Sequence, residues 1–466
     1  MNATRPKVNG IEALGALLGR ARERSAALRR PVLASLTLPY DAPTWPSLDA
    51  SSECVLWQQP SRDVKMLAVG HAAAIEAAGV NRFGHVREGL TRLLAEAVIG
   101  GLPGSAPIAL AGFAFDIQEG PEQTPEERWR AFPDGLAVLP RLLFARRDGM
   151  TTLTLNALVS PEDNPRRLED TLLSELDASS RPAPQPEGET LPRLLEDDDA
   201  MERWRDGVTG LTERIAAGEA GKVVLARRVT VRKDSPWSLD AVVRRLASRY
   251  AECTVFAVKR GEACFLGAAP ETLVSLHDGT VRVDCLAGSY PRGATPAEDA
   301  AQAEALLASD KDRREHAFVA QAICEALSSV CDDLRVPDAP GVKRFANVQH
   351  LHTPIEAHVD SERHVLDLVE RLHPTPATAG LPRERSLCLI RRYEDFDRGW
   401  YAGPIGWLDA RGEGEFAVAL RSALVAGCEA LLYAGCGIVS GSDPAREYAE
   451  SSIKLEAMLW ALNARR

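Results

Sequence analysis

The sequence predicts an α+β fold in which antiparallel β-sheets pack face to face and helices cover their outer sides. Several short segments alternate apolar and polar residues and are rich in β-branched side chains, as antiparallel strands are. Long segments with helical spacing interrupt these runs, which does not match a Rossmann or barrel pattern. The chain has 466 residues, of which 45% are hydrophobic, so it can bury a large core and is not disordered as a whole.

The N-terminal part is expected to contain several strands and one helical stretch. Residues 73–101 have helical spacing, and the basic stretch from Arg20 to Arg30 reads as a solvated helix face. Pro, Gly and acidic residues replace the periodic hydrophobic residues from Ser179 to Ala200, which marks a linker or an exposed loop. The expected strands are 32–39, 52–59, 107–116, 140–149 and 151–159.

The C-terminal part begins with a helix over 201–221 and ends with one that starts near Pro444. Between them we expect two runs of antiparallel strands, with a turn at Asp278-Gly279 in the first. The other expected elements are a strand over 222–233, a helix over 238–252, strands within 254–290, one or two helices over 297–331 and strands within 403–439.

Composition excludes several functional classes. A formal net charge of -11 argues against a nucleic-acid-binding surface. The nine cysteines are scattered without a CxxC pair, which indicates buried reduced thiols in a cytoplasmic protein rather than a zinc site. No stretch is long and apolar enough to be a membrane span or a secretory signal.

Charged residues in apolar or glycine-rich surroundings are the main functional signal. Buried charges cost free energy unless they are paired or coordinated, so they often mark chemistry. Glu447, Glu450 and Lys454 have spacing that places them on one helix face, after a glycine-rich stretch read as a loop that could approach a ligand. A solvated stripe of ion pairs is the alternative for these three residues. Glu315 could join them in a Mg²⁺ site or be an ordinary surface glutamate.

Four further residues could supply acid–base chemistry and anion binding. Lys222 begins an apolar strand and could act as a base in a pocket, or extend to solvent. Glu271 lies between a turn of small residues and an apolar strand, where burial would raise its pKa and suit a general acid. Arg421 is expected in mid-strand as a partner for a carboxylate, and Tyr401 could donate to the same anion or be a core aromatic.

The chain resembles the chorismate-utilising enzymes, and most closely the isochorismate synthases. The resemblance covers roughly residues 201–466 and is looser before them, chiefly at GFAFD and WRAFPDGLAVLPRLLF. Many ordered motifs make a chance agreement improbable. The matching strings are KVVLAR, LGAAPE, LAGSYPRG, LLASDKDRREH, VQHLHTPI, LHPTPATAG, YAGPIGW, LRSALV, AGCGIV and AESSIKLE.

The resemblance implies the fold and the reaction. The fold would have two large antiparallel sheets packed together and flanked by helices, with residues 1–198 a divergent part of the same body and 199–466 the catalytic core. Chorismate would be converted to isochorismate by addition of water at C2 and loss of the C4 hydroxyl. Lys222 would be the general base and Glu271 the general acid. Glu315 and Glu450 would bind Mg²⁺, supported by Glu447.

The remaining implied residues bind the dianionic substrate. Arg421 and Tyr401 would hold the enolpyruvyl carboxylate, and backbone amides near two of the glycines would help neutralise charge. The full implied set is Arg421, Tyr401, Gly288, Ser289, His350, Gly435, Gly437 and Lys454.

Several related activities remain as alternatives. A salicylate synthase would share the same base, acid and metal ligands. Anthranilate and aminodeoxychorismate synthases use a glutaminase partner, but the first lacks a lysine at position 222 and the second carries a lysine where this chain has Ala287. Water is therefore the expected nucleophile, and no glutaminase partner is expected. A non-catalytic chorismate-binding protein is disfavoured because Lys222 and Glu271 are both present. The resemblance leans toward menaquinone-type members over siderophore-type ones and is compatible with a monomer.

Overall fold

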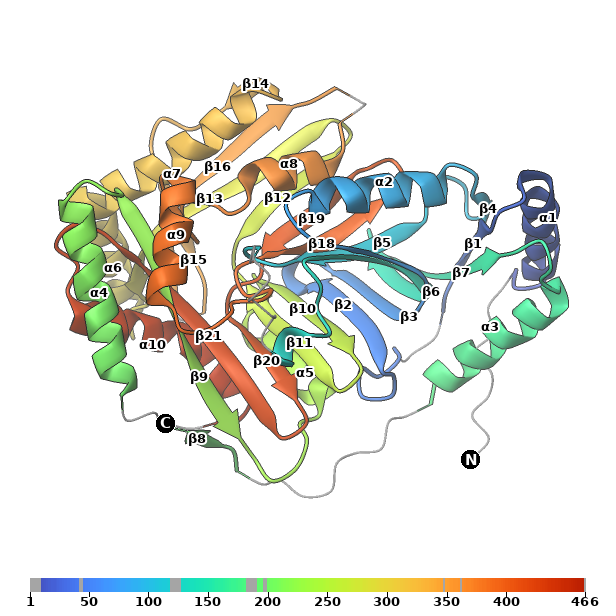
Figure 1. Ribbon diagram of the computed structural model, residues 1–466, viewed down its shortest axis with the longest axis horizontal. Coiled ribbons are helices and arrows are strands. Elements are labelled where there is room, and N and C mark those ends of the chain that lie inside the picture. Colours follow the sequence, from blue (N-terminus) through green and yellow to red (C-terminus); the bar gives the residue numbers. More distant parts are fainter. Residues whose placement is uncertain are drawn as a thin grey trace.

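The computed structural model describes residues 10–41, 45–117, 127–181, 191–195, 199–346, 348–360 and 363–464. Its strands form one hydrogen-bonded network that doubles back on itself as two facing sheets (Figure 1). Among the described strands, β1 and β4 pair in parallel and the other ladders are antiparallel. The predicted α+β class with facing antiparallel sheets is confirmed.

The first sheet runs from the N-terminal strands to those that begin and end the C-terminal part. Its strands lie in the order β4 (Val98–Gly101), β1 (Val32–Pro39), β7 (Met150–Val159), β6 (Gly135–Arg147), β3 (Val64–Ala77), β2 (Glu53–Gln59), β10 (Thr254–Arg260), β11 (Ala263–Ala269), β20 (Ser422–Ala426), β21 (Glu429–Ile438) and β9 (Lys222–Arg232). The short strands β8 (Arg193–Leu195) and β17 (Gly380–Leu381) also pair with β9.

The second sheet starts from the same β6, whose first residues pair with β5 (Ile108–Phe113). Both sheets therefore share one long strand, and chain segments from both ends of the sequence lie side by side. The order continues through β18 (Pro404–Asp409), β19 (Gly414–Val418), β12 (Thr272–His277), β13 (Thr280–Pro291) and β16 (Val348–His358), with β14 (Asp332–Arg335) and β15 (Gly341–Arg344) on the far side of β16.

Side-chain alternation along the strands produces three apolar layers. Trp57 and Phe265 of the first sheet and Trp407 of the second lie in the layer between the sheets, whereas Leu56 and Phe416 lie in the two outer layers. This follows from the period of two along a strand, because neighbouring residues point to opposite faces. The burial of all these residues fixes the register of both sheets.

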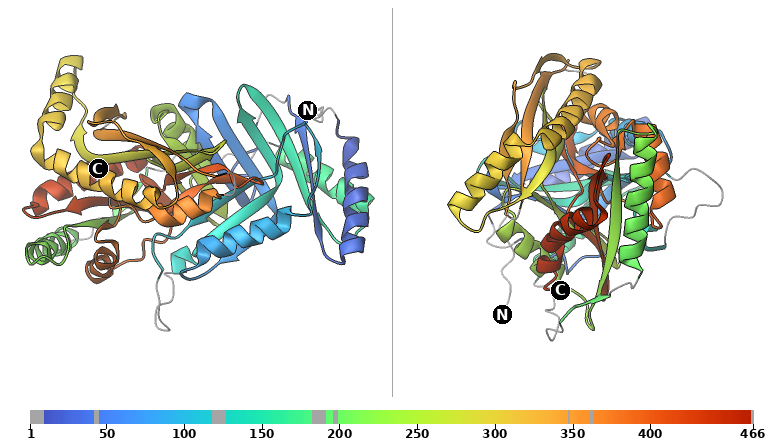
Figure 2. Two further views of the ribbon diagram at one scale, coloured as in Figure 1. Left: turned by 90° about the horizontal axis from the view of Figure 1, so that it is seen from above. Right: turned by 90° about the vertical axis from the view of Figure 1, so that its left-hand side faces the viewer.

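Helices cover the two outer layers and the ends of the sheets. In the figures, α1 (Ala13–Leu28) and α3 (Pro165–Ser179) lie at one end of the molecule, and α4 (Ala200–Ala216) and α10 (Pro444–Ala461) at the other (Figures 1 and 2). The remaining helices are α2 (Arg82–Leu94), α5 (Leu239–Arg249), α6 (Pro296–Ala308), α7 (Asp310–Ser328), α8 (Val365–Leu372) and α9 (Arg383–Tyr393). In the part of the chain described, none of the helices combines the length and apolar character needed to cross a bilayer.

The expected strands and helices are confirmed, with one helical stretch shorter than expected. The stretch 73–101 is helical only over α2, because its first residues complete β3 against β6 and its last form β4 against β1. The region 297–331, expected as one or two helices, forms two, because Ser309 caps the second by accepting from the backbone N–H of Asp312. The expected linker lies partly outside the described residues, at 182–190 and 196–198. All nine cysteines are free and most are buried, as expected.

Candidate active site

All of the predicted site residues line one cavity of about 140 Å³. The cavity receives side chains from both sheets: β9 and β21 of the first, and β13 and β16 of the second. Helices α7 and α10 supply the carboxylates. Segments that are far apart in the sequence therefore place two lysines, an arginine and four glutamates around one small space: Lys222, Lys454, Arg421, Glu271, Glu315, Glu447 and Glu450.

Lys222 and Glu315, which both line this cavity, form an ion pair. The Nζ of Lys222 donates to Oε1 of Glu315 at 2.7 Å, and the two side chains are 11% and 19% exposed. Gly437 makes room for the pair, because a Cβ at this position would lie 2.5 Å from Cε of Lys222. The alternative in which Lys222 extends into solvent is therefore wrong.

The glycine-rich stretch is a strand here, which corrects the expectation of a loop. Gly435 and Gly437 belong to β21 and pair with Ala226 and Val224 of β9, and neither has a positive φ. Only Gly441, beyond the strand, has a left-handed φ of 81°. The two strand glycines matter for the space that they leave beside the cavity rather than for unusual backbone angles.

Glu271 is buried beside this ion pair, just before β12. Burial, and then the charge of Asp284, raise the pKa of Glu271 to about 8, although Lys222 and Lys343 oppose the shift. The carboxyl is only 6% exposed. Glu271 is therefore a protonated acid at neutral pH, as a general acid requires.

Glu315 and Glu450 have the opposite protonation state. Burial alone would raise the pKa of Glu315, but the charge and hydrogen bond of Lys222 leave it below its ordinary value. Burial likewise works against the ionised form of Glu450, and Lys454 reverses the effect through a 2.7 Å ion pair. Both groups are carboxylates near neutral pH.

The C-terminal helix presents its charged face to the cavity, and the Glu450 side chain is also 39% exposed. Asp443 caps α10 by accepting from the backbone N–H of Arg446, which sets where the helix begins. Glu447 is 7% exposed, and the Nζ of Lys454 also donates to the carbonyl of Gly435 at 2.9 Å. The three residues therefore line the cavity, although the ion pair of the alternative interpretation is present between Glu450 and Lys454.

Arg421 lies in the bend between β19 and β20, not in mid-strand as expected. Its φ of 50° is left-handed, which ends one strand and turns the chain before the next. The residue is 9% exposed, and burial lowers the pKa of its guanidinium. No residue in the described part of the chain gives this guanidinium a hydrogen bond or ion pair. A buried cation without an anion is costly, so this arrangement indicates a site for a bound anion.

Tyr401 lines the cavity near Arg421 and stacks on Tyr433, with ring centroids 5.2 Å apart and planes at 17°. Burial raises the pKa of Tyr401 to about 12, so the phenol stays a hydrogen-bond donor at neutral pH. The residue combines the two roles considered for it, a packed aromatic ring and a polar group in the cavity.

Gly288, Ser289 and His350 form the wall supplied by the second sheet. A β-bulge falls between Ala287 and Ser289, with Gly288 at a φ of 74°. The Nδ1 of His350 lies 2.8 Å from Oγ of Ser289 and 3.2 Å from the carbonyl oxygen of Gly288. Burial lowers the pKa of His350 to about 3, so the ring is neutral, and its Nε2 has no hydrogen-bond partner among the described residues.

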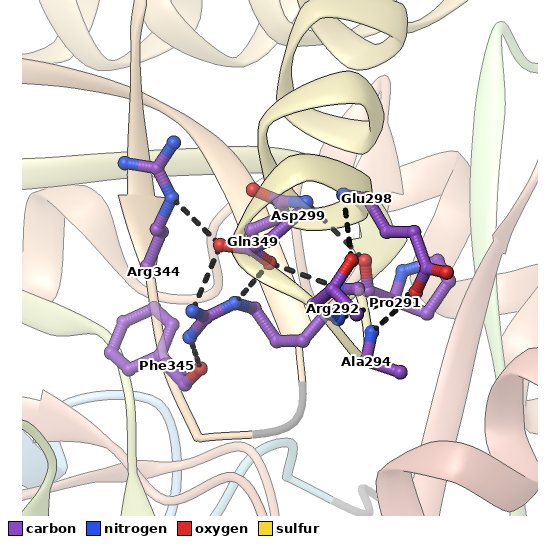
Figure 3. Close-up of polar contacts among 10 residues, drawn as sticks. Pro291, Arg292, Ala294, Glu298, Asp299, Arg344, Phe345 and Gln349 are labelled. Carbon is purple, nitrogen blue, oxygen red and sulfur yellow. Dashed lines mark hydrogen bonds and ion pairs between the residues drawn. The ribbon is translucent and has the colours of Figure 1, made fainter.

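A polar cluster beyond the bulge anchors the end of β13 (Figure 3). Arg292 makes two hydrogen bonds to Asp299 at the start of α6, at 2.6 and 2.9 Å, and donates to the carbonyl of Phe345 at 2.6 Å. Gln349 of β16 donates to the carbonyl of Pro291. These bonds hold the bulge against α6 and β16, and so fix the wall of the cavity.

Comparison with known proteins agrees with the motifs. A sequence model of the family described as "Chorismate binding enzyme" matches residues 21–463. The chain belongs to this family. It is 39% identical to the salicylate biosynthesis isochorismate synthase of Pseudomonas aeruginosa, over 100% of this chain and 97% of the relative. It is 36% identical to the isochorismate synthase MenF of Bacillus subtilis, over 77% of this chain and 75% of that relative.

A solved structure shows the same fold. The menaquinone-specific isochorismate synthase MenF of Escherichia coli aligns with a TM-score of 0.77 at 28% identity, over 96% of this chain and 99% of that one. The family predicted from the sequence is confirmed.

Chorismate binding enzymes are generally metal-dependent, and the residues present fit a hard cation. Ligand atoms of Glu447, Glu450 and Cys436 lie within 4.8 Å of one another. Burial and the neighbouring Glu450 raise the pKa of Glu447, and a cation held between the two carboxylates would remove their repulsion. The thiol of Cys436 is an unsuitable ligand, because burial raises its pKa and it donates to the backbone carbonyl of Glu447. Glu315 lies on the same cavity and interacts electrostatically with Glu450.

The structure adds cavity residues that the sequence did not single out. Lys311 lies one helical turn before Glu315 and acts electrostatically on that carboxylate. Arg398 is 4% exposed, pairs with Glu394 and donates to the carbonyls of Thr378 and Val224 at 2.9 and 2.8 Å. The i, i+4 spacing of Glu394 and Arg398 could have predicted an ion pair on a helix, but it could not have predicted that the pair is buried.

Proposed function

We propose that this chorismate binding enzyme is an isochorismate synthase, an isomerase that moves the hydroxyl group of chorismate from C4 to C2. The observation that carries the proposal is the presence of Lys222 and a protonated Glu271 on the wall of the same cavity. The names of its full-length and structural relatives support the same activity. The product would enter menaquinone or siderophore biosynthesis.

The residues of the cavity can perform both proton transfers. Lys222 donates to Glu315 in the resting site. As a general base it would first give up one proton to become the neutral amine, and would then accept a proton from the water that attacks C2. Glu271 would give its proton to the departing C4 hydroxyl. A base on one side and an acid on the other allow addition and elimination without free hydroxide.

The two carboxylates of the substrate would bind at two different parts of the cavity. Arg421 and Tyr401 would bind the enolpyruvyl carboxylate, because a guanidinium fork and a phenol both donate hydrogen bonds. Lys454 would add positive charge nearby. Glu315, Glu450 and Glu447 would hold Mg²⁺, which when bound would stabilise the charge that develops at the ring carboxylate.

We also propose that residues 199–466 form the catalytic core and that residues 1–198 are a more divergent part of the same body. The cavity-lining residues all fall between Lys222 and Lys454, which supports the first statement. The ladders β2–β10 and β5–β18 join the two parts, which supports the second.

Product analysis tests the proposal. The purified protein is incubated with chorismate and MgCl₂, with and without EDTA, and products are separated by HPLC and identified by NMR. We expect isochorismate alone, formed only with metal. Salicylate with pyruvate would instead indicate a salicylate synthase, and an aminated product with added ammonia would indicate an amine-transferring relative.

Two lysine variants at the ends of one strand separate catalysis from folding. Lys222→Ala should lower turnover by about 10²- to 10⁴-fold, the usual worth of a general base, while chorismate binding measured by calorimetry persists. Lys233→Ala, just past the far end of β9, should retain wild-type turnover. Equal turnover in the two variants would contradict the assigned base.

A further inference from the structure

A cluster of three polar residues, Asp284, His352 and Lys343, lies near Glu271 and has no role in the proposed reaction. Asp284 of β13 accepts from Nε2 of His352 at 2.6 Å and from Nζ of Lys343 at 2.9 Å. The Asp284 side chain is 20% exposed. Burial works against its charge, but the hydrogen bonds and the charge of Lys343 lower the pKa of Asp284 to about 2. Asp284 is therefore a firmly held anion.

The register of the second sheet turns this cluster toward the cavity. Leu286 pairs with His352 and Lys343 pairs with His350, and paired residues of an antiparallel ladder share a face. Asp284 lies two residues before Leu286 and so is on that face as well. Leu286 and His350 both line the cavity.

Glu271 approaches from the neighbouring strand: it immediately precedes β12, which pairs with β13, and it lines the same cavity as Leu286. The charged and titratable groups that act on it are Lys222 from β9, Asp284 and the Cys285 thiol from β13, and Lys343 from β15. A fixed anion beside a buried carboxyl group favours its neutral form, and a cation favours its ionised form.

We propose that Asp284, fixed as an anion by His352 and Lys343, is a positioning residue that keeps a proton on Glu271. This inference rests on the proposed function, in which Glu271 donates that proton. Asp284 does not line the cavity, so it acts through Glu271 and not on the substrate. A cluster that only joined β13, β15 and β16 would stabilise the sheet without changing how Glu271 titrates.

Two substitutions that should shift the pKa of Glu271 in opposite directions test the proposal. Asp284→Asn removes the anion and should move the alkaline limb of the kcat/KM profile to lower pH, by about one unit. Lys343→Met removes the opposing cation and should move the same limb to higher pH. Glu356→Gln is the matched control, because this exposed carboxylate pairs with Arg282 on the same sheet at 2.8 Å, and the limb should not move.

Infrared difference spectroscopy supplies a readout that does not need turnover. The carboxyl band that disappears in Glu271→Gln reports the protonation of Glu271 directly, and its midpoint should shift in the same directions in the two variants. If wild-type protein made no isochorismate, the proposed function would fail while this titration still decided the role of Asp284. An unshifted midpoint in Asp284→Asn, or shifts of the same sign in both variants, would overturn the inference.

Discussion

Replacing Gly437 with alanine should slow the reaction by about 100-fold while the protein stays folded. The new Cβ would lie 2.5 Å from Cε and 3.1 Å from Nζ of Lys222, and 3.3 Å from Oε1 of Glu315. Ordinary contacts begin near 3.4 Å, so the end of the lysine must move by about 1 Å. A displacement of that size costs about two orders of magnitude in rate, or about 2.7 kcal/mol in the barrier.

The assay is steady-state formation of isochorismate from chorismate at saturating Mg²⁺, together with a thermal melt of each protein. Folding should survive, because the group that must give way is the end of a flexible side chain. Gly221→Ala is the matched control: it precedes Lys222 directly, and its Cβ would meet only the carbonyl oxygen of Leu381 at an ordinary 3.6 Å. A Gly437→Ala enzyme within about threefold of wild type would refute the reasoning, as would an equal loss in the control.

Three further outcomes follow from the cavity. Because Glu271 must carry its proton and its pKa is about 8, kcat/KM should fall as pH rises through about 8 and stay level just below it; Glu271→Gln should abolish turnover. Arg421→Met should raise KM for chorismate by about 10- to 100-fold, the worth of a charged hydrogen bond, yet raise the melting temperature because an uncompensated buried charge is removed. Arg227 donates to Ser451 and Ser452 at 2.6 and 2.8 Å and so fixes the rotation of α10; Arg227→Gln should weaken Mg²⁺ binding measured by calorimetry with less effect on KM for chorismate.

The charged residues of the site could be predicted because charged side chains in apolar stretches cost free energy to bury, and such stretches can be recognised in the sequence. A lysine, glutamates and an arginine within apolar or glycine-rich stretches need compensation wherever the chain folds. The motifs then supplied the family, and with it the facing sheets. Strands such as β1 and β9 were predictable because their alternation is local.

What the sequence did not reveal depends on contacts between distant segments. The role of Gly437 is visible only once β21 lies beside Lys222, and the left-handed bend at Arg421 only once β19 and β20 are seen to lie in different sheets. Asp284 reads as an ordinary polar residue in a strand until β15 and β16 bring Lys343 and His352 against it. The hydrophobic periodicity of a single segment does not predict contacts between segments that are far apart in the sequence.

The pairing of N-terminal strands with C-terminal ones has a consequence for synthesis of the protein on the ribosome. β5 ends at Phe113, but its partner β18 begins only at Pro404. In the same way, β2 is synthesised well before its partner β10. At about 5–20 residues per second, translation leaves the edge of β5 without its partner for roughly 15 to 60 s. Open strand edges invite pairing with other chains. The yield of folded protein should therefore respond to elongation rate and to chaperones that shield these edges, even where the finished enzyme is stable.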